Sequence, residues 1–268
     1  MIPSWQGTDE TRRYHPALMT PAPPQPVLAQ ARAIYRDAAT LYRAHVGAVI
    51  GSAAIVLVPF ALLDGAGLLT ADSSDTHPVA AVTLVMVVVG TSGLSGLASI
   101  FYAGYLDHTA EAWRQASPAP SRGRVVRALP WRHLIVASLA VYFFETVGFA
   151  LFVVPGLVAS ALLCLTGPLL VSEELDARHA LRRSAALVRR QPMLVAITVV
   201  IPLLIEGSLA DFAGILLGHD VVLEIAFEVI ITLFLASFLG VVEVTTAHHL
   251  QHAYPLETAM DRSGDKAS

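Results

Sequence analysis

Acidic side chains interrupt long apolar stretches of this sequence, where a carboxylate is costly and often marks a functional site. Glu145 and Glu206 fall near the middle of two such stretches, and Glu228 lies in a third. No Lys or Arg occurs inside any of the apolar stretches to neutralise these carboxylates. The three carboxyls must therefore be protonated, hydrogen-bonded, hydrated or paired with a cation.

Three hypotheses follow for these carboxyls. In the first, Glu145, Glu206 and Glu228 together form a proton or cation site of the kind that a transporter uses. In the second, each is a protonated carboxyl that makes a hydrogen bond between helices and serves the fold alone. In the third, the carboxylates lie in a water-filled vestibule that is open to the outside. The first hypothesis requires the three side chains to face one cavity, so the packing of the helices decides between them.

Five arginines gather in the segment 176–190, which reads DARHALRRSAALVRR. They are Arg178, Arg182, Arg183, Arg189 and Arg190. At helical spacing, Ala177, Leu181, Ala185 and Val188 form an apolar face. The pattern predicts a basic amphipathic helix on the cytoplasmic leaflet, with each arginine attracted to anionic lipid by about 1 kcal/mol. Alternatively, the helix only anchors the chain and sets its topology.

Six apolar stretches are long enough to cross a bilayer, since a crossing takes about 20 residues. They span about 46–70, 79–105, 133–154, 155–173, 192–217 and 220–248. Of the 268 residues, 55% are hydrophobic and 14% are charged, against about 25% charged in soluble domains. We expect an all-α, multi-pass membrane protein with six transmembrane helices and a basic amphipathic helix between the fourth and fifth. This composition excludes a soluble enzyme, a nucleic-acid binder and a disulfide scaffold.

The basic residues predict the orientation. All 17 Lys and Arg residues lie before the first span, in two connections, or in the tail, so that one face of a six-span topology carries them all. The positive-inside rule then places both termini in the cytoplasm. Arginine far outnumbers lysine and alanine is abundant, which is typical of a bacterial genome rich in G and C. We therefore predict a bacterial plasma-membrane protein.

Three regions are expected along the chain. Residues 1–27 are polar and rich in proline, which predicts a disordered cytoplasmic arm. Residues 28–254 form the membrane domain, beginning with an interfacial helix over 28–45, and 255–268 form a cytoplasmic tail. Between the third and fourth spans, Pro155 and Gly156 are predicted to reverse the chain, because proline disfavours helix before it and glycine permits unusual backbone angles.

Motifs for catalysis are absent from the sequence. His248 and His252 stand four residues apart, a spacing that can hold a metal. A solvated helix end is the preferred interpretation, because there is no HExxH motif. We therefore predict no catalytic residue, no metal and no cofactor, and a protein that is not an enzyme.

Three stretches of the chain match a known pattern. They read VLAQARAIYRDAATLYRAHVGAVI, PGLVASALLCLTGPLLVSEEL and ALRRSAALVRR. Together they resemble the membrane domain attached to some bacterial glycerophosphoryl diester phosphodiesterases, a group that also contains stand-alone membrane homologues. The phosphodiesterase barrel of that family carries an HRG motif, which this chain lacks. The resemblance implies a six-span membrane domain linked to lipid metabolism or the envelope, without the phosphodiesterase activity.

The sequence leaves two functions open. The first is a non-enzymatic membrane protein that binds lipid or organises another membrane protein. The second is a small proton- or cation-coupled transporter that uses Glu145, Glu206 and Glu228. Membrane lipids are the expected partners in both cases, nucleic acid is not, and the sequence does not indicate the oligomeric state.

Overall fold

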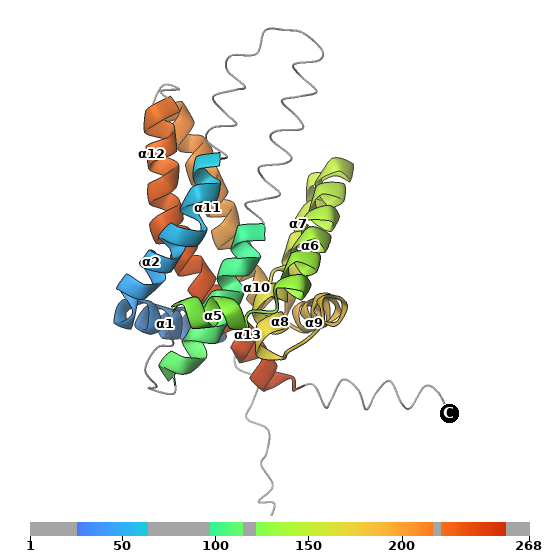
Figure 1. Ribbon diagram of the computed structural model, residues 1–268. Coiled ribbons are helices and arrows are strands. Elements are labelled where there is room, and N and C mark those ends of the chain that lie inside the picture. The colour runs from blue at the N-terminus through green and yellow to red at the C-terminus, as the bar shows by residue number, and fades with distance from the viewer. Residues whose placement is uncertain (1–25, 64–96, 115–121, 217–220, 256–268) are drawn as a thin grey trace, which may run out of the picture.

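The computed structural model describes residues 26–63, 97–114, 122–216 and 221–255 (Figure 1). Every regular element in these ranges is a helix, so the predicted all-α fold is confirmed. Most of the proline-rich arm and of the tail lies outside these ranges, as does most of the second predicted span.

Several helical segments are long and apolar enough to cross a membrane. Four meet that test alone: Val46–Leu63, Trp131–Leu151, Val154–Ser172 and Val222–Ala253. A fifth is added if Ala177–Arg190 and Pro192–Glu206, which are bent by 101° at their junction, count as one span. The described helices therefore fit a multi-pass membrane protein with four to five of the expected spans.

Helix α1 (Val27–Ala44) crosses the lower end of the molecule in Figure 1 and leads into α2 (Val46–Val56), which the helix 58–63 continues. The range of α1 agrees with the helix expected over 28–45. Ala31, Ile34 and Ala38 recur at helical spacing and are buried. Arg32 and Arg36 lie exposed on the other side. The alternation of residue types along α1 thus sets which of its faces packs.

The helix 97–114 packs closely on α8 (Thr166–Ser172) and α13 (Ser237–Ala253). A Cβ atom at Gly167 would lie 2.8 Å from the Ile100 carbonyl oxygen, and one at Gly240 would lie 2.9 Å from the Tyr102 ring. Glycine at both places therefore allows the backbones to approach. Tyr102 is buried, and its hydroxyl donates to the Val49 carbonyl of α2 at 3.1 Å.

Helices α6 (Trp131–Leu151) and α7 (Val153–Leu163) form an antiparallel hairpin, preceded by the short α5 (Arg122–Ala128). The prediction that Pro155 and Gly156 make the turn is wrong, because the extended residue Phe152 alone separates the two helices. Pro155 lies in the first turn of α7, where its missing N–H is tolerated. Gly156 packs against Gly148 of α6.

The rest of the chain forms a bent helix and a long hairpin. Helix α9 (Ala177–Arg190) ends at Gln191, and α10 (Pro192–Val195), η1 (Ala196–Val200) and α11 (Ile201–Leu216) then run away from it. The return path consists of α12 (Val221–Ile231), η2 (Thr232–Ala236) and α13. Both η1 and η2 are π-helical turns, a rare form that often occurs at functional sites.

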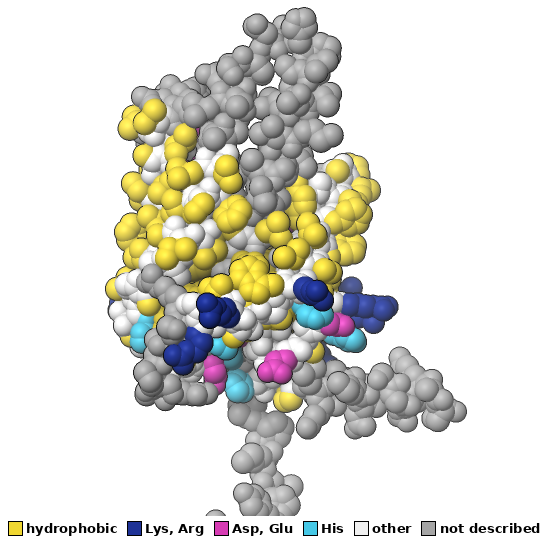
Figure 2. Space-filling model, in the orientation of Figure 1, with side chains coloured by type: hydrophobic (Ala, Val, Ile, Leu, Met, Phe, Trp, Pro, Cys, Tyr) yellow, Lys and Arg dark blue, Asp and Glu magenta, His cyan; other side chains and the backbone are white. Residues whose placement is uncertain are grey.

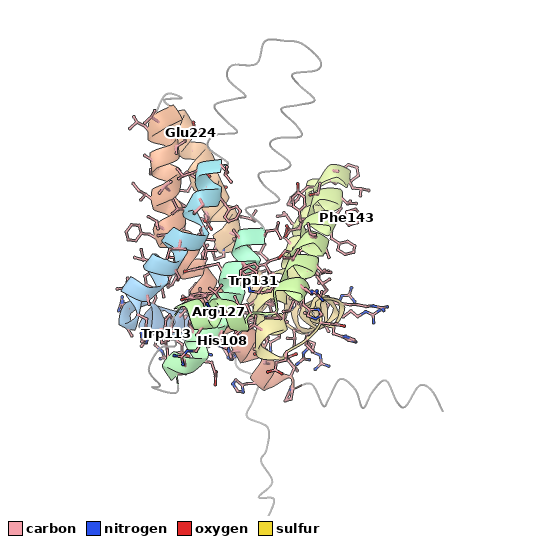
Figure 3. All side chains as sticks on the ribbon, viewed as in Figure 1. His108, Trp113, Arg127, Trp131, Phe143 and Glu224 are labelled. Atoms are coloured by element: carbon pink, nitrogen blue, oxygen red, sulfur yellow. The ribbon has the colours of Figure 1, made fainter. Side chains whose placement is uncertain are left out.

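Charged side chains and histidines gather in a band at the lower end of the view in Figure 2, while apolar side chains cover the helices above. The labelled side chains of Figure 3 show the same separation between a polar lower part and an apolar upper part. His108, Trp113 and Arg127 lie in the lower part, Trp131 lies just above them, and Phe143 projects outward from α6 higher up. Glu224 lies near the start of α12, at the upper end of the view. We call the lower region, which holds α1, α5 and α9, the polar end.

Candidate functional site

Three glutamates line one elongated cavity between the long helices. Glu206 comes from α11, Glu228 from α12 and Glu243 from α13, and the cavity measures about 340 Å³. Glu228 and Glu243 are fifteen residues apart, or about 22 Å along a helix axis. The cavity therefore extends along the continuous helix Val222–Ala253, which carries one carboxyl at each of these two levels.

Two of these glutamates share a second cavity as well. Glu206 and Glu228 also line an adjoining cavity of about 200 Å³, together with Phe60 and Ala61 of the helix 58–63. Among the described residues that line the two cavities, none is Lys, Arg or His. Buried carboxyls in such surroundings are protonated, hydrogen-bonded, hydrated or paired with a cation, because the apolar medium disfavours a bare carboxylate.

The π-helical segments contribute to the wall of the larger cavity. Thr198 and Val199 of η1 line it, as do Thr232 and Ala236 of η2. A π-helical turn bonds residue i to residue i+5 and widens the helix locally, so it changes the direction in which the following side chains point. In the chain, η1 precedes Glu206 by one to two helical turns, and η2 follows Glu228 by one. The widened turns thus flank both glutamates.

Glu145 lies apart from this cavity, on the α6–α7 hairpin. Its carboxyl is hydrogen-bonded to the Ser160 hydroxyl of α7. Of the three glutamates predicted to form one site, the structure thus brings together Glu206 and Glu228 and leaves Glu145 elsewhere. Glu243 was not predicted as a site residue. Its spacing of about four whole helical turns from Glu228 places both carboxyls on one face of the same helical stretch, and this could have been read from the sequence.

The arginines of α9 divide into two groups. Arg178, Arg182, Arg189 and Arg190 are exposed. Arg190 also places its guanidinium carbon 4.8 Å from the centre of the Tyr254 ring. The exposed group forms a basic surface at the polar end, visible at the right of Figure 2.

The buried face of α9 is turned relative to the predicted apolar face. Ala180, Ser184 and Leu187 are fully buried, whereas Leu181 and Ala185 are only half-buried. The reason is that α9 packs on α6, α7 and α8. In that packing, the Ser184 hydroxyl donates to the Leu162 carbonyl at 2.7 Å.

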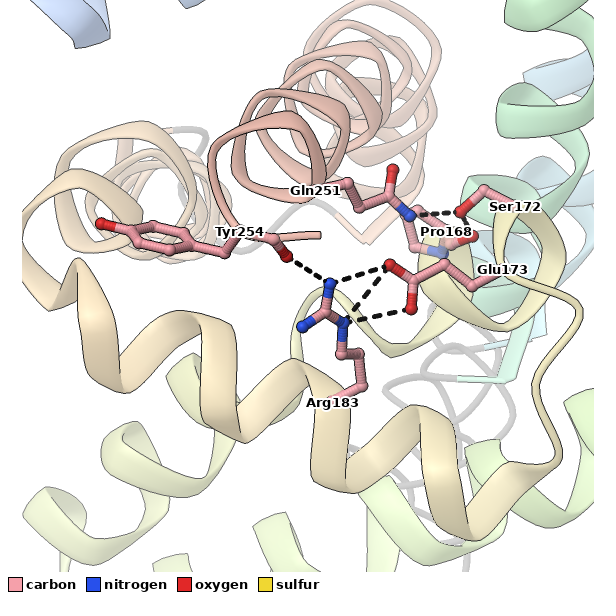
Figure 4. A network of polar contacts seen from close by, with 6 residues as sticks. All are labelled: Pro168, Ser172, Glu173, Arg183, Gln251 and Tyr254. Atoms are coloured by element: carbon pink, nitrogen blue, oxygen red, sulfur yellow. Dashed lines mark hydrogen bonds and ion pairs between the residues drawn. The ribbon is translucent and has the colours of Figure 1, made fainter. Parts of the chain in front are cut away.

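Arg183 points inward, unlike the other arginines predicted to contact lipid head groups (Figure 4). Its side chain is 7% exposed and pairs with Glu173, which is 10% exposed. The guanidinium also donates to the Tyr254 carbonyl at 2.6 Å. Nearby, Gln251 donates to Ser172 at 2.6 Å. Because the guanidinium donates to Glu173 and Tyr254 and is buried, Arg183 cannot contact lipid head groups as the sequence predicted.

A polar pocket of about 600 Å³ opens close to this network. The helix 97–114 supplies Asp107 and His108 to it, and α13 supplies His248 and His252. His248 Nε2 lies 2.9 Å from Asp107 Oδ1. Within the described ranges, no group of three or more His, Cys, Asp and Glu side chains could hold a metal ion. Because His248 and His252 are four residues apart, they lie on one face of α13, and both line this polar pocket.

The chain was also compared with known proteins. Neither the family models, nor the curated proteins, nor the solved structures include a match to it.

Proposed function

We propose that this protein is a small membrane transporter that binds a proton or a small cation in the cavity lined by Glu206, Glu228 and Glu243. The observation that carries the proposal is that Glu206 and Glu228, from two different helices, share one cavity with each other and with a third carboxyl. Such convergence is what a binding site needs, and dispersed structural carboxyls would not require it.

The surroundings favour a positively charged ligand. The cavity lining holds three carboxyls and, among the described residues, no basic side chain. Ser99, Thr198 and Thr232, whose side chains carry hydroxyl oxygens, also line it. Oxygen atoms of this kind suit a proton relay or a hard cation. The length of the cavity along α12 and α13 supports transfer between two levels of the bilayer.

Flux across a membrane tests this proposal. The purified protein is reconstituted into liposomes, and proton flux is followed with a pH-sensitive dye, with Na⁺ and K⁺ gradients measured in parallel. Glu206→Gln and Glu228→Gln are expected to reduce flux at least about tenfold, because each removes a titratable oxygen from the cavity. Glu145→Gln is the matched control, since Glu145 is an intramembrane glutamate outside this cavity. Wild-type flux in both cavity variants would overturn the proposal.

A second function is favoured by a different observation, the exposed basic surface of α9. We propose that Arg178, Arg182 and Arg189 bind lipid phosphates at the cytoplasmic leaflet of a bacterial plasma membrane. The resemblance to the membrane domain of glycerophosphoryl diester phosphodiesterases supports a link to lipid metabolism or to a membrane partner. The positive-inside pattern of the sequence supports the orientation, with both termini in the cytoplasm.

Native mass spectrometry from lipid nanodiscs tests lipid binding. The wild type is expected to retain anionic phospholipid, and the triple variant R178Q/R182Q/R189Q is expected to lose it. The matched control is R178K/R182K/R189K, which keeps the charge and should retain lipid if attraction to phosphate dominates. Equal retention by the Gln and Lys variants would contradict a role for these arginines. The same spectra report the oligomeric state.

A further inference from the structure

Two tyrosines of α1 reach the two π-helical segments that border the cavity lined by Glu206, Glu228 and Glu243, which we call the glutamate cavity. Tyr35 and Tyr42 are seven residues apart, or two helical turns, so they lie on one side of α1. That side faces the bundle, because α1 packs on α10, η1 and α13. The two tyrosines thus form a pair of contacts from one helix to both widened turns.

Tyr35 contacts η1 directly. Its hydroxyl donates to the Ile197 carbonyl at 2.9 Å, and the Thr198 carbonyl lies 3.5 Å away. A π-helical turn interrupts the i to i+4 ladder, so its carbonyls need another donor or a longer bond. The phenol supplies such a donor. Burial raises the pKa of Tyr35, which keeps the group protonated.

Tyr42 contacts η2 through Ser237. The Tyr42 and Ser237 hydroxyl oxygens lie 3.2 Å apart, and the Ser237 hydroxyl is within hydrogen-bonding reach of the Leu233 and Phe234 carbonyls. Both of those carbonyls belong to η2. Ser237 is fully buried, and the ring of Tyr42 packs edge-on against Phe238 at a centroid distance of 5.5 Å. The relay therefore joins α1 to the carbonyls of η2.

We infer that Tyr35 and Tyr42 are positioning residues of the glutamate cavity, and that α1 sets the cavity's shape by holding η1 and η2 in their widened form. The inference rests on the proposed function of that cavity. Thr198 of η1 and Thr232 of η2 line the cavity themselves, so a change in either turn alters its wall. Arg32 and Arg36 of α1 are exposed, so the same helix also carries basic side chains at the surface.

Hydrogen exchange tests the contact with each turn separately. The variants are Tyr35→Phe, Tyr42→Phe and Ser237→Ala, in full-length protein in nanodiscs. Tyr35→Phe is expected to speed amide exchange about two- to tenfold in peptides covering 196–201, the gain that the loss of one hydrogen bond allows. Tyr42→Phe and Ser237→Ala should do the same for 232–237. Thr40→Val is the matched control, because it removes a hydrogen bond within α1, from Thr40 to the Arg36 carbonyl, that does not reach the cavity.

A second readout reports on the cavity itself. A membrane-permeant carbodiimide reacts with protonated carboxyls, and mass spectrometry gives the labelled fraction of Glu206 and Glu228. Tyr35→Phe and Tyr42→Phe should change that fraction at least about twofold, whereas Thr40→Val and the labelling of Glu145 should not respond. A purely structural role would leave the labelling pattern unchanged.

The outcomes separate this inference from the transport proposal. If exchange in η1 and η2 and the labelling of Glu206 and Glu228 match the wild type in all three variants, the inference is overturned. If they respond as expected while E206Q and E228Q transport normally, the positioning by α1 is right and transport through the cavity is wrong.

Discussion

Arg183 and Glu173 form a buried ion pair, with Arg183 Nε 3.1 Å from Glu173 Oε2. Glu173 follows the last residue of α8, and Arg183 lies in the middle of α9. Because the same guanidinium donates to the Tyr254 carbonyl, the pair also holds the end of α13. One arginine therefore joins three helices at the polar end.

Loss of this arginine should destabilise the fold. Arg183→Gln is expected to cost about 3–5 kcal/mol, since it leaves the buried Glu173 carboxylate without its partner. Arg182→Gln is the control at the adjacent position, where an exposed side chain should change stability by no more than about 0.5 kcal/mol. Thermal unfolding in detergent micelles, followed by circular dichroism, measures both. Equal unfolding midpoints for the two variants would contradict the role of the ion pair.

The end of α8 has an unfavourable backbone conformation that glycine should relieve. Glu174 has a φ of 50°, in the left-handed region, and the Leu175 N–H donates to the Leu170 carbonyl at 3.2 Å as in a helix-terminating motif. Glu174→Gly should stabilise the protein by about 1 kcal/mol, because glycine avoids the clash of Cβ in that region. Glu174→Ala removes the same charge but keeps Cβ, and its unfolding midpoint should not rise. A rise in both variants would assign the gain to charge instead.

The α6–α7 hairpin depends on contact between two glycines. A Cβ atom at Gly148 would lie 2.8 Å from the Gly156 Cα atom, which is backbone and cannot turn away. Gly148→Ala should therefore force the helices apart and destabilise the protein by about 1–3 kcal/mol. Gly47→Ala is the control, because a Cβ atom at Gly47 of α2 meets nothing within 4 Å. Similar unfolding midpoints for the two variants would show that the close approach does not matter.

The start of α9 should be sensitive to acid. The pKa of Asp176 is lowered from its ordinary value of 3.8, mainly because the carboxylate accepts the His179 backbone N–H, with a smaller contribution from the His179 side chain. A carboxyl whose folded pKa is depressed contributes stability above its unfolded pKa and loses it as the pH falls through the folded value. The wild type should therefore be more stable than Asp176→Asn at pH 6.

That advantage should shrink as the pH drops below about 4. Unfolding midpoints of both proteins, measured between pH 3 and pH 7, test this. His179→Ala separates the two contributions, because it removes the side-chain contact and keeps the backbone N–H. A difference between wild type and Asp176→Asn that stays constant over the whole range would contradict a stabilising charge at this helix end.

The extent of many helices could be predicted from the sequence. The helix expected over 28–45 is Val27–Ala44, and the basic segment 176–190 forms α9 over Ala177–Arg190. The break between that segment and the next apolar stretch falls at Gln191 and Pro192, as the change in composition indicated. Helix formation depends on neighbours within a few residues, so local composition and proline placement suffice for these predictions.

The turn between the third and fourth spans could not be predicted in this way. Proline followed by glycine is typical of a turn, and the same pair also suits the first turn of a helix that packs closely on another. The second alternative depends on Gly148, which lies eight residues earlier on the partner helix. Only packing between the helices distinguishes the two.

By itself the sequence determined that the chain is helical and apolar, that its charges lie between the apolar stretches, and that carboxyls occur inside them. Tertiary structure decided which of these side chains meet. Arg182 and Arg183 are adjacent and chemically identical, yet one is exposed and the other is buried against Glu173. Glu206 and Glu228 share a cavity, and Glu145 does not. Rotation of a helix about its axis by one residue, about 100°, exchanges such roles, and contacts with distant helices set that rotation.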